Sequence, residues 1–279
     1  MHPVLFSTTF FGLFKEPWSL HVYGLLIAAG FLLAMQLAAR QAGREGEDPD
    51  RLIDLAFYLL LAGLIGSRIV FIFTKLDQYV ANPLEIVMFW RGGLVFYGGF
   101  IGAAVYLVYY ARRYRLDYFK LVDVMIPYVA MAHAFGRLGC LAAGCCFGKP
   151  TEMPWGIIFP VASMAHQQQQ SQGLVELGES ALPVHPTQLY EAGFELALFW
   201  LLLMIRPYKR FHGQLFLTWL SIYPLGRIII ELFRGDKERG VYGLLSTSQY
   251  ISIAVAGAAI AVYVYLRRQR SGSTAVATA

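Results

Sequence analysis

Charged residues are scarce in this sequence of 279 residues. Asp, Glu, Lys and Arg make up 15% of it, hydrophobic residues make up 57%, and the mean hydropathy is +0.51. A soluble domain of this length cannot hide so much apolar surface in one core. The composition therefore excludes a nucleic-acid-binding protein, a secreted scaffold and a disordered chain, and it indicates a polytopic membrane protein.

Cysteine is equally scarce, because only Cys140, Cys145 and Cys146 occur. Three clustered cysteines exclude a disulfide framework. The spacing lacks C-x-x-C, and adjacent cysteines are poor ligands for a tetrahedral metal site. We interpret them as buried or incidental, with a redox pair or a metal site as alternatives. The amino-terminal segment lacks the basic cluster and the cleavage pattern of a signal peptide, so the first apolar run is expected to remain in the mature protein.

Seven apolar stretches have about the 20 residues that are needed to cross a bilayer. The expected spans are 20–39, 53–74, 94–114, 122–141, 188–205, 214–233 and 249–266. The sequence predicts an all-α polytopic membrane protein with about seven transmembrane helices in one domain, 1–270. The long loop 149–187 is expected to form a small periplasmic cap, and 271–279 a disordered cytoplasmic tail.

The basic residues are distributed unevenly between alternate loops. Thirteen of the 23 lie on one side and seven on the other, while Arg68, Arg137 and Arg227 fall inside spans. Lys and Arg accumulate in cytoplasmic loops. The distribution therefore predicts an external amino terminus and an internal carboxyl terminus. No internal repeat is visible, which gives no support to an inverted-repeat transporter.

The three arginines inside spans are unusual, because a guanidinium at membrane depth costs several kcal/mol unless it faces a partner. Glu231 lies one helical turn after Arg227 and can pair with it. The other candidate carboxylates are Glu191 and, near the inner ends of the spans, Asp54 or Asp123. A bound phosphate would also satisfy these arginines, because their planar forks match phosphate oxygens. The alternative is that each guanidinium is tied to backbone carbonyls.

Five motifs follow one another along the chain. They are Tyr23-Gly24, Arg91-Gly-Gly-Leu-Val-Phe-Tyr97-Gly98-Gly99, Gly136-Arg137-Leu-Gly139 with Gly148 nine residues later, His185-Pro-Thr-Gln188-Leu-Tyr-Glu191, and Gly226-Arg227-Ile-Ile-Ile-Glu231-Leu-Phe-Arg234. In this order they resemble the prolipoprotein diacylglyceryl transferases. These bacterial membrane enzymes move a diacylglyceryl group from phosphatidylglycerol onto the lipobox cysteine of a prolipoprotein.

The resemblance implies a seven-helix body with a periplasmic cap in the bacterial cytoplasmic (inner) membrane. It implies phosphatidylglycerol and the signal peptides of prolipoproteins as partners, no nucleic acid, and neither a cofactor nor a metal. The expected catalytic residues are Arg137, Arg227, Glu231 and Tyr23, which match the family, together with Tyr97. The substrate-binding residues that the resemblance implies are Arg137, Arg227, Gly98, Gly99, Gly148, His185, Gln188, Glu191 and Arg234.

The chain departs from the family pattern in two places. Tyr97 stands where the best-known members carry a histidine that has been proposed as the base for the thiol proton. The segment after Arg137 carries Cys140, Ala143 and Cys145, where asparagines and a glutamate are usual. These departures leave the base open and reduce the hydrogen-bonding capacity beside the head group.

The expected reaction is attack of a thiolate on the glyceryl carbon next to the phosphate, with a thioether and glycerol phosphate as products. Arg137 and Arg227 would neutralise the leaving phosphate. Tyr97 is given a hydrogen-bonding role, because tyrosine is a weak base at neutral pH, and His133 and His185 are the alternative bases. The competing functions are a membrane anion or lipid transporter and a membrane thiol oxidoreductase.

Overall fold

The structure is a computed structural model, which describes residues 4–8, 18–81, 83–88, 92–176, 178–235, 241–242 and 245–276. The chain divides into two compact units, Met1–Ala34 with Met125–Ala279, and Met35–Val124. Both divisions fall inside long helices, α1 (Val22–Arg44) and α5 (Tyr118–Ala143). Each unit is described by itself.

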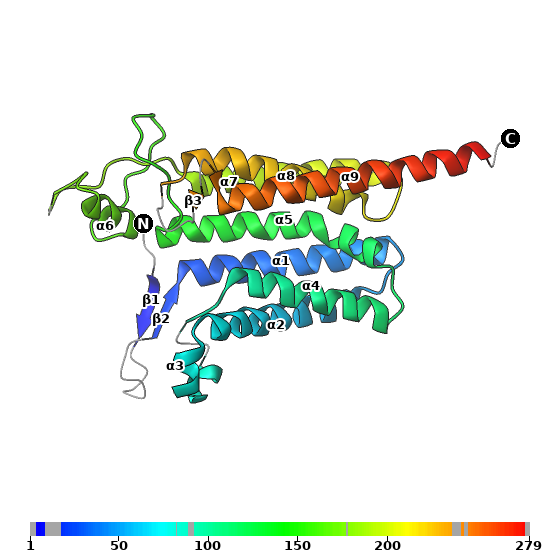
Figure 1. The fold of residues 1–279 in the computed structure, drawn as a ribbon, viewed down its shortest axis with the longest axis horizontal. Coiled ribbons are helices and arrows are strands. Elements are labelled where there is room, and N and C mark those ends of the chain that lie inside the picture. Colours follow the sequence, from blue (N-terminus) through cyan, green and yellow to red (C-terminus); the bar gives the residue numbers. More distant parts are fainter. Residues whose placement is uncertain are drawn as a thin grey trace. The chain divides into compact units, whose positions relative to one another are not determined.

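Seven long helices confirm the all-α polytopic prediction (Figure 1). They are α1, α2 (Pro49–Thr74), α4 (Phe96–Arg113), α5, α7 (Thr187–Ile205), α8 (Gln214–Phe233) and α9 (Thr247–Val276). Within the described ranges, six of these helices are long and apolar enough to cross a membrane. The other is α4, whose 18 residues include Arg112 and Arg113. The count of seven crossings is therefore approximate.

Glycines bring α2 and α4 into close contact within the unit 35–124. A Cβ atom on Gly66 would lie 2.3 Å from the Gly98 carbonyl oxygen, and one on Gly98 would lie 2.4 Å from the Gly66 carbonyl oxygen. No side chain fits at either distance. Small residues allow this backbone approach in membrane helices. Packing against α2 therefore accounts for Gly98, which the sequence had suggested as a substrate contact.

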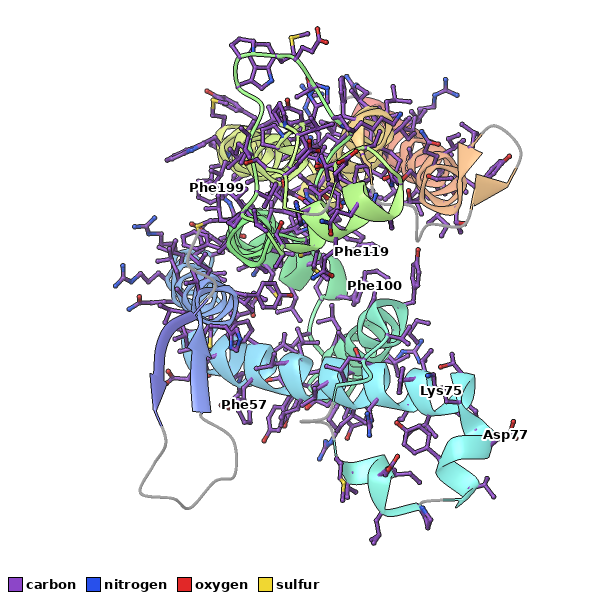
Figure 2. All side chains as sticks on the ribbon, turned by 90° about the vertical axis from the view of Figure 1, so that its left-hand side faces the viewer. Phe57, Lys75, Asp77, Phe100, Phe119 and Phe199 are labelled. Carbon is purple, nitrogen blue, oxygen red and sulfur yellow. The ribbon has the colours of Figure 1, made fainter. Side chains whose placement is uncertain are left out.

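Arg68 of α2 organises the short elements α3 (Leu76–Ala81) and η1 (Pro83–Val87). Its guanidinium donates hydrogen bonds to backbone carbonyls of Glu85, Ile86, Met88, Gly92 and Gly93. Figure 2 shows Lys75 and Asp77 at the turn between α2 and α3. Arg68 is thus tied to backbone carbonyls of its own unit, which is one of the two alternatives that the sequence left open. Arg91 lies outside the described residues.

The unit that contains the carboxyl terminus is built around α7, α8 and α9, which run alongside one another (Figure 1). Segment 149–187 lies at one end of them and contains α6 (Met164–Ser171). Phe147, Phe159, Ala165 and Val184 form a small core for this segment, and Val184 forms bridges with Pro150 and Ile157. The expected cap is therefore a folded insertion, while its periplasmic location stays a prediction.

Several short elements were not anticipated from the sequence. They are the hairpin β1 (Val4–Thr8) and β2 (Trp18–His21), the hairpin β3 (Val241–Tyr242) and β4 (Leu245–Ser246), and the 3-10 turn η3 (Arg206–Tyr208). Residues Trp18–His21 pair with Val4–Thr8, so the first span begins at Val22 and not at residue 20.

The carboxyl-terminal helix is longer than expected. Helix α9 continues to Val276, although a disordered tail was predicted from residue 271. No proline interrupts this stretch, and each added residue extends the helical hydrogen bonding. Residues 277–279 lie outside the described part.

Candidate active site

Glu191 of α7 joins the two arginines that the sequence had marked as phosphate ligands. One carboxylate oxygen lies 3.0 Å from Nη2 of Arg137 on α5, and the other lies 2.9 Å from Nη1 of Arg227 on α8. The Glu191 side chain is only 2% exposed. A buried carboxylate shared by two guanidinium groups fixes their separation.

A second carboxylate holds the other end of this cluster on α8. Glu231 lies one turn after Arg227, and its Oε2 is 2.9 Å from Nη2 of that arginine. The pairing expected from the i,i+4 spacing is therefore present. Arg227 forms ion pairs with carboxylates on two helices, α7 and α8. These contacts orient the plane of its guanidinium group in the absence of substrate.

His133 and Glu195 form a polar pair beside Arg137. His133 lies one helical turn before Arg137, and its Nδ1 is 2.5 Å from Oε1 of Glu195 on α7. Nε of Arg137 donates to Nε2 of His133 at 3.2 Å, so Nδ1 carries the proton and donates to Glu195. The imidazole is therefore held in one tautomer, with its acceptor nitrogen directed at Arg137.

Two aromatic side chains of α8 contact the buried glutamates of α7. Tyr223 donates to Oε1 of Glu191 at 3.3 Å, and Nε1 of Trp219 donates to Oε2 of Glu195 at 3.3 Å. Their rings are stacked with centroids 4.9 Å apart. Both buried glutamates thus receive a hydrogen bond in addition to their charged partners, which offsets part of their desolvation.

Three segments of the chain meet at Gly148, which lies in the loop after α5. Its N–H donates to the His185 carbonyl, and it forms an isolated bridge with the buried Arg234 at the end of α8. A Cβ atom at Gly148 would lie 2.5 Å from the His185 carbonyl oxygen. The close approach of the backbones explains the glycine, and it ties the end of α8 to the segment before α7.

The amino-terminal end of α7 is fastened to the loop after α5. Thr187 Oγ1 donates to the Cys146 carbonyl at 2.7 Å, and Gln188 Nε2 donates to the Cys145 carbonyl at 2.7 Å. His185 Nδ1 lies 3.1 Å from the Tyr190 hydroxyl. His185 and Gln188 therefore hold the walls of the site in place.

The positive charges of two arginines act on the Cys146 thiol. Hydrogen bonds with the Cys140 and Cys145 thiols lower the pKa of Cys146, and the positive charges of Arg234 and Arg137 act in the same direction. A cysteine at this position ionises more readily than a free one. The sequence spacing alone had not indicated that the three thiols interact.

The remaining expected site residues are divided between the two units. Tyr23 of α1 packs against α5, because a Cβ atom on Gly139 would lie 3.1 Å from its ring. Tyr97 and Gly99 belong to α4 in the unit 35–124, where Gly99 faces Ser67 of α2 and Tyr97 is 53% exposed. Within its own unit, the arginine cluster is built from residues of α5, α7 and α8.

Glu195, Trp219 and Tyr223 were missed by the sequence reasoning. Glu195 could have been found, because a carboxylate inside an apolar span is costly and it lies one turn after Glu191 on the same face. The two aromatic residues carried no such signal, because Trp and Tyr are common in membrane helices.

Comparison with known proteins decides the family. The family model described as prolipoprotein diacylglyceryl transferase matches residues 10–265. The chain belongs to this family. A phosphatidylglycerol–prolipoprotein diacylglyceryl transferase of Clostridium tetani is 35% identical over 91% of this chain and 93% of its own length. The protein of that name from Bordetella bronchiseptica is 35% identical over 85% of this chain and 87% of its own length.

Membership identifies the chain as a transferase and a multi-pass membrane protein. The comparisons give no support to the transporter or the thiol oxidoreductase alternatives. A third relative with the same name, from Geobacter sulfurreducens, is 34% identical over 82% of this chain and 84% of its own length. Family membership thus covers the helices that carry the arginine cluster.

Proposed function

We propose that this chain transfers a diacylglyceryl group from phosphatidylglycerol to the thiol of a lipobox cysteine in a prolipoprotein. The bond between the glyceryl carbon and the phosphate oxygen breaks, a thioether forms, and glycerol phosphate leaves. The observation that carries this proposal is the pair Arg137 and Arg227, bridged by Glu191. Family membership supplies the substrate class, and this pair supplies the means to bind a phosphodiester.

The two arginines act on the charge that develops on the leaving phosphate. Each guanidinium has five N–H groups. The described contacts of Arg137 use its Nε and Nη2, and those of Arg227 use Nη1 and Nη2. Donors on both side chains are therefore available to the phosphate oxygens. Preorganised donors of this kind in a site shielded from water are worth several kcal/mol in the transition state.

His133 is the proposed acceptor of the thiol proton. Its Nε2 accepts from Arg137, while Glu195 holds its Nδ1. When a phosphate oxygen takes over the Nε–H of Arg137, the lone pair on Nε2 is released and can take the proton. Glu195 then stabilises the imidazolium. Lipid binding would thereby prepare the base, and Tyr97 keeps a hydrogen-bonding role.

The proposed location is the bacterial cytoplasmic membrane, with an external amino terminus, segment 149–187 in the periplasm and the carboxyl terminus inside. The uneven distribution of basic residues between alternate loops supports this orientation. The reaction then occurs where exported prolipoproteins meet phosphatidylglycerol.

The test is transfer of radiolabelled diacylglyceryl from phosphatidylglycerol to a lipobox peptide by the purified protein. The control reactions use a peptide with serine in place of cysteine and the Arg137→Ala enzyme. Thioether product that requires both the peptide thiol and Arg137 supports the proposal. A folded wild-type protein that makes no product under these conditions would refute it.

A further inference from the structure

Three thiols meet where α5 ends. Cys140 lies in the last turn of the helix, Cys145 and Cys146 follow in the loop, and the three Sγ atoms all lie within 4.8 Å of one another. The spacing along the chain had argued against such a cluster. It forms because Gly144 and Cys146 both adopt left-handed backbone conformations, with φ of +72° and +62°, which turn the chain back on the helix.

The loop is held by groups other than the thiols. Thr187 and Gln188 of α7 bind the carbonyls of Cys146 and Cys145, and the Cys145 N–H donates to the Cys140 carbonyl at 3.1 Å. A left-handed conformation at a residue other than glycine carries strain and persists only where its surroundings enforce it. The three sulfur atoms are therefore brought together by the backbone and by α7.

Three convergent sulfurs favour a soft cation. Thiolates select Cu(I) and zinc among the common biological metals. A metal–sulfur bond of about 2.3 Å, as in zinc thiolate sites, separates three sulfurs in a trigonal plane by about 4 Å. This separation is within the 4.8 Å limit found here, so binding needs only small movements of the side chains.

The number of ligands distinguishes between the two cations. Structural zinc sites almost always have four protein ligands. Among the described residues, the candidate group consists of three cysteines and no fourth His, Cys, Asp or Glu. Cu(I) is satisfied by three thiolates. We propose that Cys140, Cys145 and Cys146 bind one Cu(I) ion in a three-thiolate site.

The surrounding charge suits such a complex. Three thiolates and Cu(I) carry a net charge of −2, and the guanidinium groups of Arg137 and Arg234 act on the cluster. Metal binding would release the thiol protons. None of the three cysteines is a proposed catalytic group, so copper binding can be measured separately from the transfer reaction.

Binding can be measured on the full-length protein, purified in detergent, reduced and freed of metal. Cu(I) is added in the presence of the chromogenic chelator bicinchoninate, and the copper that stays with the protein is determined. We expect one Cu(I) per chain, and we expect the bound ion to protect all three thiols from alkylation by a maleimide. The protection measurement requires no variant.

The matched variants are Cys145→Ser and the triple variant Cys140→Ser, Cys145→Ser, Cys146→Ser. Both should lose stoichiometric binding, and retained transfer of diacylglyceryl would show that they fold. Copper held equally well by the triple variant would overturn the proposal. It would also be overturned by a wild-type protein whose thiols stay fully reactive with Cu(I) present, or by Zn(II) displacing Cu(I) from the site.

Discussion

Glu191 is the residue that contacts both Arg137 and Arg227. Its two oxygens contact Arg137 and Arg227 separately, whereas Glu231 contacts only Arg227 among the ion pairs described. Removal of one partner from a buried pair costs about 3–5 kcal/mol. Glu191→Gln should therefore lower the melting temperature in detergent more than Glu231→Gln does. Equal losses of thermal stability in the two variants would contradict this ranking.

Arg137 illustrates why charge alone is insufficient at this site. Its Nε donates a hydrogen bond to His133, and its Nη2 forms an ion pair with Glu191. The single ammonium group of lysine cannot reproduce this geometry. We expect Arg137→Lys to reduce kcat by about 100-fold or more, the usual effect of losing a preorganised donor. Single-turnover transfer from phosphatidylglycerol measures this. Wild-type turnover in that variant would exclude bidentate phosphate binding.

The proton acceptor can be assigned by comparing His133 with Tyr97. His133→Gln keeps a hydrogen-bond donor for the buried Glu195 but cannot take a proton at neutral pH. It should lower kcat by about 100-fold or more while KM changes little, because a positioned base contributes at least that much. Tyr97→Phe should retain most turnover. The reverse result would transfer the role of base to Tyr97.

The residues of the site were predictable to different degrees. Arg137, Arg227 and Glu231 could be found because charge inside an apolar span is costly and needs a partner. Glu191 could be named as a candidate partner, but its bridge to both arginines could not be predicted, because it joins α5, α7 and α8, and the rotation of each helix about its axis depends on packing. The convergence of the cysteines was hidden in two left-handed residues of one loop.

At the scale of helices, the close contact between α2 and α4 depends on glycines, which have no side chain. A methyl group at Gly66 would meet the Gly98 carbonyl oxygen at 2.3 Å, whereas nothing lies within 4 Å of the same position on Gly257 in α9. Gly66→Ala should destabilise the protein by about 1–3 kcal/mol through overpacking. Gly257→Ala is the matched control and should be neutral or slightly stabilising, because alanine favours helix.

Thermal unfolding of both variants in the same detergent tests this difference. Equal melting temperatures for Gly66→Ala and the wild type would mean that α2 and α4 can separate without cost.

The helices themselves were predictable, because apolar runs of membrane length have few other conformations. The hairpins and the 3-10 turns were not, because their short pairings leave no clear periodicity in the sequence.

For the whole molecule, the number of crossings decides on which sides the termini lie. Seven crossings place the two ends on opposite sides of the membrane. Six crossings would place them on the same side, and six of the described helices are long and apolar enough to cross. We expect α4 to cross, so an amino-terminal epitope tag should bind antibody in intact spheroplasts. A carboxyl-terminal tag should bind it only after permeabilisation. Both tags on one side would remove α4 from the crossings.

The Glu191 carboxylate lies against both guanidinium groups that are proposed to bind the phosphate of the lipid. The protein thus carries its own competing anion, tethered at a high local concentration. Chloride or inorganic phosphate would compete with this carboxylate without the help of acyl chains anchored in the bilayer. After glycerol phosphate departs, the same carboxylate still balances the charge of the arginines, so we expect soluble anions and the product to inhibit the resting enzyme only weakly.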